Sequence, residues 1–236
     1  MKHLSRGFSL TELLICFFIS MLLITILIQH LLSVSRQYQY VHAVLDETIE
    51  LQWVFDVMRA RIRHAGFTPC RSLNQLKVID TRDNPDTALK AIQIQSGEIP
   101  KLLIRKMDET SFERIDILTP DTLHIKNNSL NPDRPVIIAD CTHAEVHSMQ
   151  KAGSLIHLNK PLVFNYSPEV YIGEWVSEAF FLKQSKGLFI QQHRVDLMTK
   201  VKNIIFDLDN SKIIIKVISR LGNTYVLEEN MRTPCM

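Results

Sequence analysis

Glu12 is the residue whose setting most clearly suggests chemistry, because it places a carboxylate at the start of an apolar segment. It is the only formally charged residue between Arg6 and Arg36, and residues 13–32 are predominantly apolar. A carboxylate near the middle of a membrane helix costs roughly 2.5–3.5 kcal/mol to insert, and less near the interface, so it usually serves a function. We therefore expect Glu12 to meet a cationic partner when this segment packs against other helices.

The apolar segment itself is long enough to cross a membrane. At 1.5 Å per residue, residues 13–32 span a hydrocarbon core of roughly 30 Å. Lys2 and Arg6 precede the segment, whereas Arg36 and the pair Asp46 and Glu47 follow it. The positive-inside rule then predicts a single pass through membrane lipid, at about residues 12–32, with the N-terminus cytoplasmic and the remainder exported.

Three interpretations of this N-terminus compete. It could be an ordinary signal anchor, or a secretory peptide cleaved after the small residues Ser33, Val34 and Ser35. Neither accounts for Glu12. In the third, residues 1–7 form a short basic leader that is cut on the cytoplasmic side of the apolar run, so that Phe8 becomes the new N-terminus.

The third interpretation resembles the class III leader of type IV pilins and type II secretion pseudopilins. Such leaders end in Gly, are followed by Phe or Met, and carry Glu at the fifth mature position, where this chain has Gly7, Phe8 and Glu12. Cleavage would free an α-amine at Phe8, with an ordinary pKa of about 7.7–8.0. The resemblance implies that Glu12 of one subunit faces the Phe8 amine of a neighbour and so sets the register between subunits.

The resemblance also implies partners. A membrane prepilin peptidase would cut between Gly7 and Phe8 and N-methylate Phe8. The mature chain would then meet other minor pilins, the major pilin and an inner-membrane assembly platform.

One helix is expected over residues 8–65. Beyond the membrane segment an apolar stripe recurs at steps of three and four, and Gly66 and Pro69 stand where a helix end is favoured. The stripe consists of Val41, Val44, Thr48, Leu51, Phe55, Met58, Ile62 and Ala65. It could form a coiled coil, but packing against a sheet built from the rest of the chain is the favoured interpretation.

After Gly66 the sequence reads as short strands separated by turns. Runs rich in Ile, Val, Leu and Phe alternate with Asn, Asp, Pro and Gly. The predicted strands are 76–79, 91–95, 101–104, 115–118, 122–126, 136–139, 145–149, 154–158, 179–183 and 188–193, followed by a hairpin of 201–208 with 212–218. No linker divides them, so residues 66–236 are expected to form one periplasmic, β-rich globular head.

The head resembles, more loosely, that of a PilW-type minor pilin. The similarity rests on its size, the run from Gly66 to Cys70, the step Asp140 to Cys141, and the late hairpin. It implies an α+β, pilin-like fold, in which a long N-terminal α-helix packs on an antiparallel β-sheet head with two small sheets.

The four cysteines divide by compartment. Cys16 lies in the membrane segment, which leaves Cys70, Cys141 and Cys235 in an oxidising periplasm with thiols enough for one bridge. Similarity to the family's Gly-x-x-x-Cys and Asp-Cys positions favours Cys70 with Cys141. The alternative, Cys141 with Cys235, would fasten the C-terminal tail as in many major pilins.

A metal site is a weak candidate at His143, Glu145 and His147, which would share one face of a strand. The same alternation is expected of a half-buried strand with its polar face in solvent, and the order is not a zincin signature. The prediction is therefore no metal and no cofactor.

Enzyme and nucleic-acid functions have little support. The chain has no G-x-S-x-G elbow, P-loop or G-x-G-x-x-G motif, and its net charge is only +2 with both signs interspersed. The expected function is that of a minor pilin, not an enzyme, in a priming or tip complex of type IV pilus assembly. It would be stored in the bacterial inner membrane and then join the pilus at its tip or base. The alternatives are a J-class minor pseudopilin of type II secretion and, more remotely, a signal-anchored periplasmic enzyme or binding module.

Overall fold

The computed structural model describes residues 10–82, 89–126, 130–183, 187–190, 195–198, 201–209, 212–219 and 222–230. The sequence-predicted site residues Gly7, Phe8 and Cys235 lie outside these ranges. The chain divides into two compact units, Met1–Gln52 and Trp53–Met236, and each is described by itself below.

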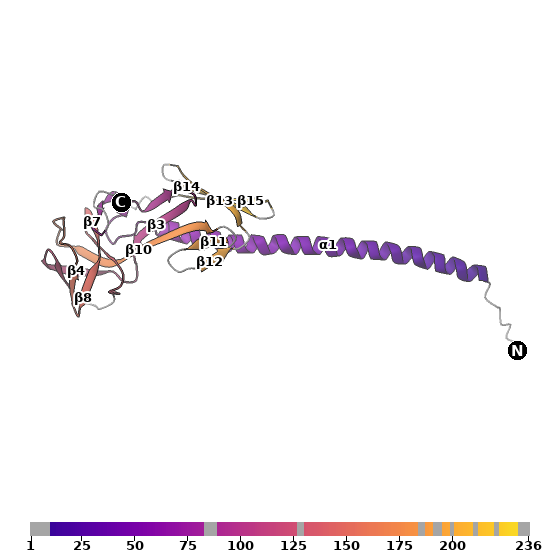
Figure 1. Ribbon diagram of the computed structural model, residues 1–236, viewed down its shortest axis with the longest axis horizontal. Coiled ribbons are helices and arrows are strands. Elements are labelled where there is room, and N and C mark those ends of the chain that lie inside the picture. Colours follow the sequence, from indigo (N-terminus) through magenta and orange to yellow (C-terminus); the bar gives the residue numbers. More distant parts are fainter. Residues whose placement is uncertain are drawn as a thin grey trace. The chain divides into compact units, whose positions relative to one another are not determined.

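A single helix, α1 (Leu10–Arg63), occupies the N-terminal part of the described chain (Figure 1). Its 54 residues contain neither Gly nor Pro, the two residues that most disfavour a helix interior. Hydroxyls within it, such as those of Ser20 and Thr25, bond to carbonyls one turn earlier, so they need no outside partner. The predicted long helix is thus present, ending at Arg63 rather than at residue 65.

Gly66 lies just beyond this helix in the left-handed conformation, with φ of 73°, as the helix-end pattern predicted. Its N–H donates to the Arg105 carbonyl over 2.8 Å, and its own carbonyl accepts from the Leu73 N–H over 2.8 Å. The chain therefore turns from the helix directly onto the sheet.

Among the described residues after α1, the short 3-10 helix η1 (Leu73–Gln75) is followed by strands that belong to two sheets. The larger sheet has 12 strands and the separate one has three, so the two expected sheets are present, the larger of them with 12 strands. The strands are β1 (Lys77–Asp80), β2 (Ile92–Gln95), β3 (Lys101–Met107), β4 (Glu113–Thr119), β5 (Thr122–Ile125), β6 (Val136–Ala139), β7 (His143–His147), β8 (Met149–Ala152), β9 (Leu155–Leu158), β10 (Val170–Lys183), β11 (Gly187–Ile190), β12 (Val195–Met198), β13 (Val201–Asp209), β14 (Lys212–Ser219) and β15 (Thr224–Asn230).

Strand β10 joins the parts of the larger sheet. Its residues 170–174 pair with β4 and β6, and its residues 175–183 pair with β3 and β11. All pairings are antiparallel except that of β1 with β7. The C-terminal strands β13, β14 and β15 form the second sheet, which contains the predicted hairpin.

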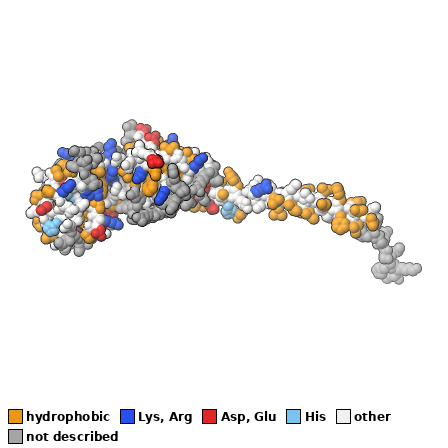
Figure 2. Space-filling view, viewed as in Figure 1, with side chains coloured by type: hydrophobic (Ala, Val, Ile, Leu, Met, Phe, Trp, Pro, Cys, Tyr) orange, Lys and Arg blue, Asp and Glu red, His pale blue; other side chains and the backbone are white. Residues whose placement is uncertain are grey.

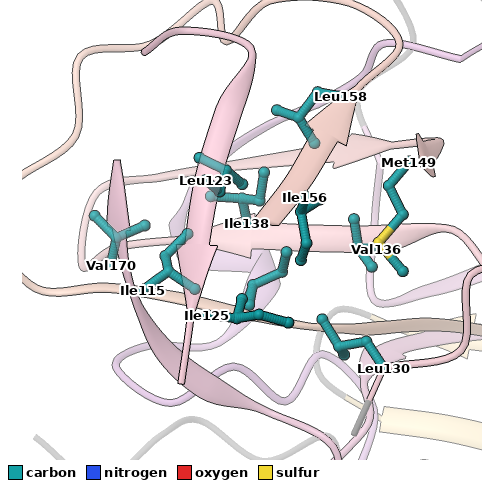
Figure 3. Close-up of a cluster of buried hydrophobic side chains, with 11 residues drawn as sticks. Ile115, Leu123, Ile125, Leu130, Val136, Ile138, Met149, Ile156, Leu158 and Val170 are labelled. Atoms are coloured by element: carbon teal, nitrogen blue, oxygen red, sulfur yellow. The ribbon is translucent and has the colours of Figure 1, made fainter. Parts of the chain in front are cut away.

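Two buried clusters lie on opposite faces of β6, all four of whose residues are buried. Figure 3 shows the first cluster, in which Val136 and Ile138 of β6 meet side chains of β4, β5, β9 and β10. The second gathers Ile137 and Ala139 with Trp175 and with residues of β1 and β7. A strand that is buried on both faces is expected to have a continuous apolar sequence, and β6 has one.

Within the second unit, α1 buries the face that carries Val54, Met58 and Ile62, each at most 1% exposed. The predicted stripe is therefore confirmed at Met58 and Ile62, but Val54 is buried where Phe55 was expected, and Phe55 is only half-buried. Sheet packing therefore holds for this part of the helix. Val41, also on the predicted stripe, is 51% exposed.

Candidate functional site

Glu12 lies in the first turn of α1 and is exposed. A carboxylate there is favoured by the partial positive charge of the helix N-terminus. If the chain begins at Phe8, a free α-amine would add a full positive charge at the same helix end, where Glu12 can offset it. Gly7 and Phe8 lie outside the described residues, so the expected pairing of Glu12 with the Phe8 amine of a neighbouring subunit stays a prediction.

The apolar residues after Glu12 are covered by nothing in the described protein. Leu13, Phe17, Met21 and Leu31, for example, are between 47% and 74% exposed. Figure 2 shows hydrophobic side chains along this part of the helix, whereas charged side chains are scattered over the head. Within the described residues, α1 is the one helix long and apolar enough to span a membrane. Lipid or the helices of other subunits can cover such a surface.

Cys70 and Cys141 form a disulfide, with 5.2 Å between their Cα atoms, so the structure contains the first of the two proposed pairings. It joins the segment after α1 to the turn between β6 and β7. Cys16 is a free, exposed cysteine of the helix. Cys235, needed for the alternative pairing, lies outside the described residues.

Asp140 organises the turn that holds Cys141. Its carboxylate accepts the N–H groups of Thr142 and His143 over 2.7 and 2.6 Å, and that of Ser167 over 3.1 Å. Burial alone would raise the pKa of Asp140, but these hydrogen bonds outweigh it and lower the pKa to about 2. The carboxylate is therefore ionised at neutral pH and fixes the turn.

The weak metal candidate is not assembled as a metal site. Glu145 and His147 are bonded to each other, with 2.8 Å between His147 Nε2 and Glu145 Oε2, whereas the His143 ring stacks on Phe164 at 4.5 Å between centroids. The described residues contain no group of three or more His, Cys, Asp or Glu side chains that could hold a metal ion.

The expectation that the polar face of this strand lies in solvent is wrong. Glu145 and His147 are buried: the second cluster covers one face of β7, and on the other face Val163 and Phe164 contact Glu145 while Thr81 contacts His147. Burial alone would raise the pKa of Glu145, but hydrogen bonds from His147, Phe164 N–H and Val163 N–H lower it. No local signal separates a buried strand of this pattern from a solvated one.

Sequence reasoning also missed how the helix end is fixed to the strands. Arg59 and Arg63 both reach Glu229 of β15, at 3.3 and 2.8 Å, and Arg61 reaches the buried Glu178 of β10 at 3.2 Å. The one signal in the sequence is that these arginines lie off the apolar stripe of the helix, which could have suggested acidic partners outside the helix.

Comparison with known proteins identifies one feature, which lies at the N-terminus. Residues 2–28 match the family described as the prokaryotic N-terminal methylation motif. No curated protein and no solved structure matches the chain. The motif is followed by the long helix and by a mostly antiparallel sheet region with a separate three-stranded sheet. The chain thus carries at its N-terminus the methylation motif, the class III leader of type IV pilin-like proteins, and continues into an α+β, pilin-like fold.

Proposed function

We propose that this chain is a minor pilin that helps to initiate type IV pilus assembly in a priming or tip complex. The observation that carries the proposal is the isolated carboxylate of Glu12, in the first turn of an exposed apolar helix, five residues after the matched leader's Gly7. An ion pair with a neighbour's Phe8 amine would neutralise both charges when the helices leave lipid for a filament core. The role is structural rather than catalytic.

The enlarged head supports a minor rather than a major subunit. Two sheets, one of 12 strands, and a disulfide across 71 residues make a large body at the end of one helix. Such a head suits a position at an end of the filament, where fewer neighbours constrain its size. In this proposal a prepilin peptidase processes the chain in the inner membrane, with the head in the periplasm, and an assembly platform then inserts it.

Substitution of Glu12 tests this role. An unpaired charge left in a buried interface costs about 3–5 kcal/mol, so Glu12→Gln should lower the assembled fraction of this chain at least about tenfold. The fraction would be measured by quantifying the chain in sheared filaments and in membranes. Ser20→Ala is the matched control, because the Ser20 hydroxyl bonds to the Cys16 carbonyl of its own helix. Assembly of the Glu12→Gln chain at the control level would overturn the proposal.

A J-class minor pseudopilin of type II secretion is the second candidate, because the leader and the large head suit it equally. Co-purification after crosslinking in the native membrane separates the two. Pilus subunits as partners support the first candidate, and pseudopilins of a secretion system support the second. An activity of the head that persists without Glu12 and without either set of partners would favour a signal-anchored enzyme or binding module.

A further inference from the structure

The loop of residues 159–169, between β9 and β10, is held by two buried carboxylates. Glu145 accepts the N–H groups of Val163 and Phe164, over 3.0 and 2.6 Å, and Asp140 accepts that of Ser167 over 3.1 Å. Both carboxylates are at most 1% exposed. The loop contains neither helix nor strand, yet hydrogen bonds to the carboxylates of Glu145 and Asp140 hold its backbone in place.

The carboxylate of Glu145 is also hydrogen-bonded to the buried His147. The Thr81 hydroxyl donates its only proton to the Val146 carbonyl over 2.8 Å, so at its 3.0 Å contact with His147 Nδ1 it must accept. His147 Nε2 faces Glu145 Oε2 at 2.8 Å. The His147 ring is therefore hydrogen-bonded at both nitrogens and lies buried beside the Glu145 carboxylate.

Such a pair is a costly way to fill a protein interior. Apolar residues of similar volume are often neutral or stabilising in place of two buried polar partners, so stability does not account for this pair. Glu145 accepts hydrogen bonds from the backbone N–H groups of Val163 and Phe164, which an apolar side chain could not do. The pair therefore serves to fix the conformation of this loop.

The fixed loop displays apolar and cationic groups. Val163 is 64% exposed, and the adjacent Phe164 ring stacks on the His143 ring and has the Lys77 ammonium 5.3 Å from its centroid. Lys160 and Glu169, both exposed, are the charged residues of the loop 159–169, and the Lys160 Nζ donates to the neutral Thr81 carbonyl. We call these five residues the docking surface: Lys77, His143, Lys160, Val163 and Phe164.

We propose that the docking surface binds an acidic, apolar segment of a neighbouring subunit in the filament. The proposal rests on the proposed function, because it names one contact between subunits of the assembled filament. Val163 and Phe164 offer apolar area to be covered, while Lys77 and Lys160 offer positive charge. The nearby carboxylates of Glu145 and Asp140 lie beneath the loop with their oxygens already bonded. The ammonium groups of Lys77 and Lys160 therefore complement carboxylates on the partner.

Photo-crosslinking in the native membrane tests this surface. A photoreactive phenylalanine analogue would replace Val163 in the full chain, with Leu118 of β4, 58% exposed, as the matched control position. We expect crosslinks from position 163, and not from 118, to a segment of a pilin-like subunit that contains Asp or Glu. The double substitution Lys77→Glu and Lys160→Glu should lower that yield about tenfold, because like charges would then meet.

Peptide mapping of the crosslinked product identifies the partner and the segment that contacts position 163. Capture of another copy of this chain through its exposed residues 207–209 (Asp, Leu, Asp) would support the proposal, since that segment has the stated chemistry. Crosslinks to lipid alone, or to a segment without carboxylates, would overturn it. So would equal crosslinking from positions 163 and 118, or a yield that the lysine substitutions leave unchanged. The mature N-terminus, measured in the same sample, distinguishes failure of the docking surface from failure of the proposed function. A correctly processed chain without these crosslinks refutes the docking surface alone.

Discussion

At the scale of single residues, the head depends on carboxylates that are charged although buried. Asp140 and Glu145 each accept several hydrogen bonds from backbone N–H groups, and these bonds rather than solvent stabilise their charge. Tyr166 lies close to both, and burial followed by the Glu145 charge raises the pKa of its phenol, so it stays protonated. The region around the disulfide is therefore sensitive to acid.

Asp140→Asn tests that sensitivity. The folded-state pKa of about 2 lies below the ordinary 3.8, so the ionised form stabilises the fold above the ordinary value, and this contribution is lost as the pH falls toward 2. At neutral pH the substitution should lower the free energy of unfolding by about 2 kcal/mol, with the difference shrinking below pH 4. Urea unfolding followed by the fluorescence of the buried Trp175 measures both effects.

Asp209→Asn, at an exposed position, is the control for the loss of one negative charge. A difference between Asp140→Asn and the natural chain that stays constant from pH 7 to 2 would show that ionisation of Asp140 contributes nothing to stability.

At the scale of elements, the junction between α1 and the sheet allows little substitution. A Cβ placed on Gly66 would lie 2.7 Å from the Ala91 Cβ and 2.9 Å from the Ser72 Oγ, and the residue's φ is positive. The disulfide of Cys70 with Cys141 then fixes the same segment to the turn before β7. Two independent constraints therefore set where the chain leaves the helix.

Gly66→Ala should destabilise the head. The left-handed conformation costs an alanine about 1–2 kcal/mol, and the contact with Ala91 adds to this. Gly97→Ala is the matched control, because nothing lies within 4 Å of its Cβ position and its φ is not in the left-handed region. Thermal unfolding of both variants measures the effect, and equal transition temperatures would contradict the assignment of Gly66 as a helix-ending residue.

Removal of the disulfide is expected to cost more than either glycine substitution. Closing a loop of 71 residues restricts the unfolded chain, and under the entropy model Cys70→Ser loses about 4 kcal/mol. Cys16→Ser should leave unfolding of the head unchanged, because Cys16 lies in the other unit. Non-reducing peptide mapping supplies the direct check, and a Cys141–Cys235 peptide would contradict the pairing.

The strand β10 shows why the sequence predicted only part of the sheet. Only its last five residues, 179–183, were predicted, because Gly173, Glu174 and Glu178 interrupt the apolar pattern before them. Gly173 is needed because a Cβ there would lie 2.6 Å from the Met107 Cγ. Glu174 pairs with Arg134 at 2.8 Å, and Glu178 with Arg61. Each reason comes from a residue distant in sequence, so local pattern could not supply it.

At the scale of the whole molecule, the N-terminal motif and the long helix could be predicted because their signals are local and lie in order along the chain. The docking surface could not, because Lys77, His143 and Phe164 meet only after β1, β7 and the loop before β10 have assembled. The same holds for the burial of Glu145 beneath that loop. Sequence therefore indicates the class of protein, while tertiary structure indicates what its head presents to partners.

The central claim is that this chain is processed as a prepilin, and mass spectrometry of the mature protein from its native membrane tests it most directly. The account predicts a chain that begins at N-methylated Phe8, and a Gly7→Val variant that retains the leader. A mature chain that still begins at Met1, or one that begins at Arg36 after cleavage beyond the apolar segment, would contradict it.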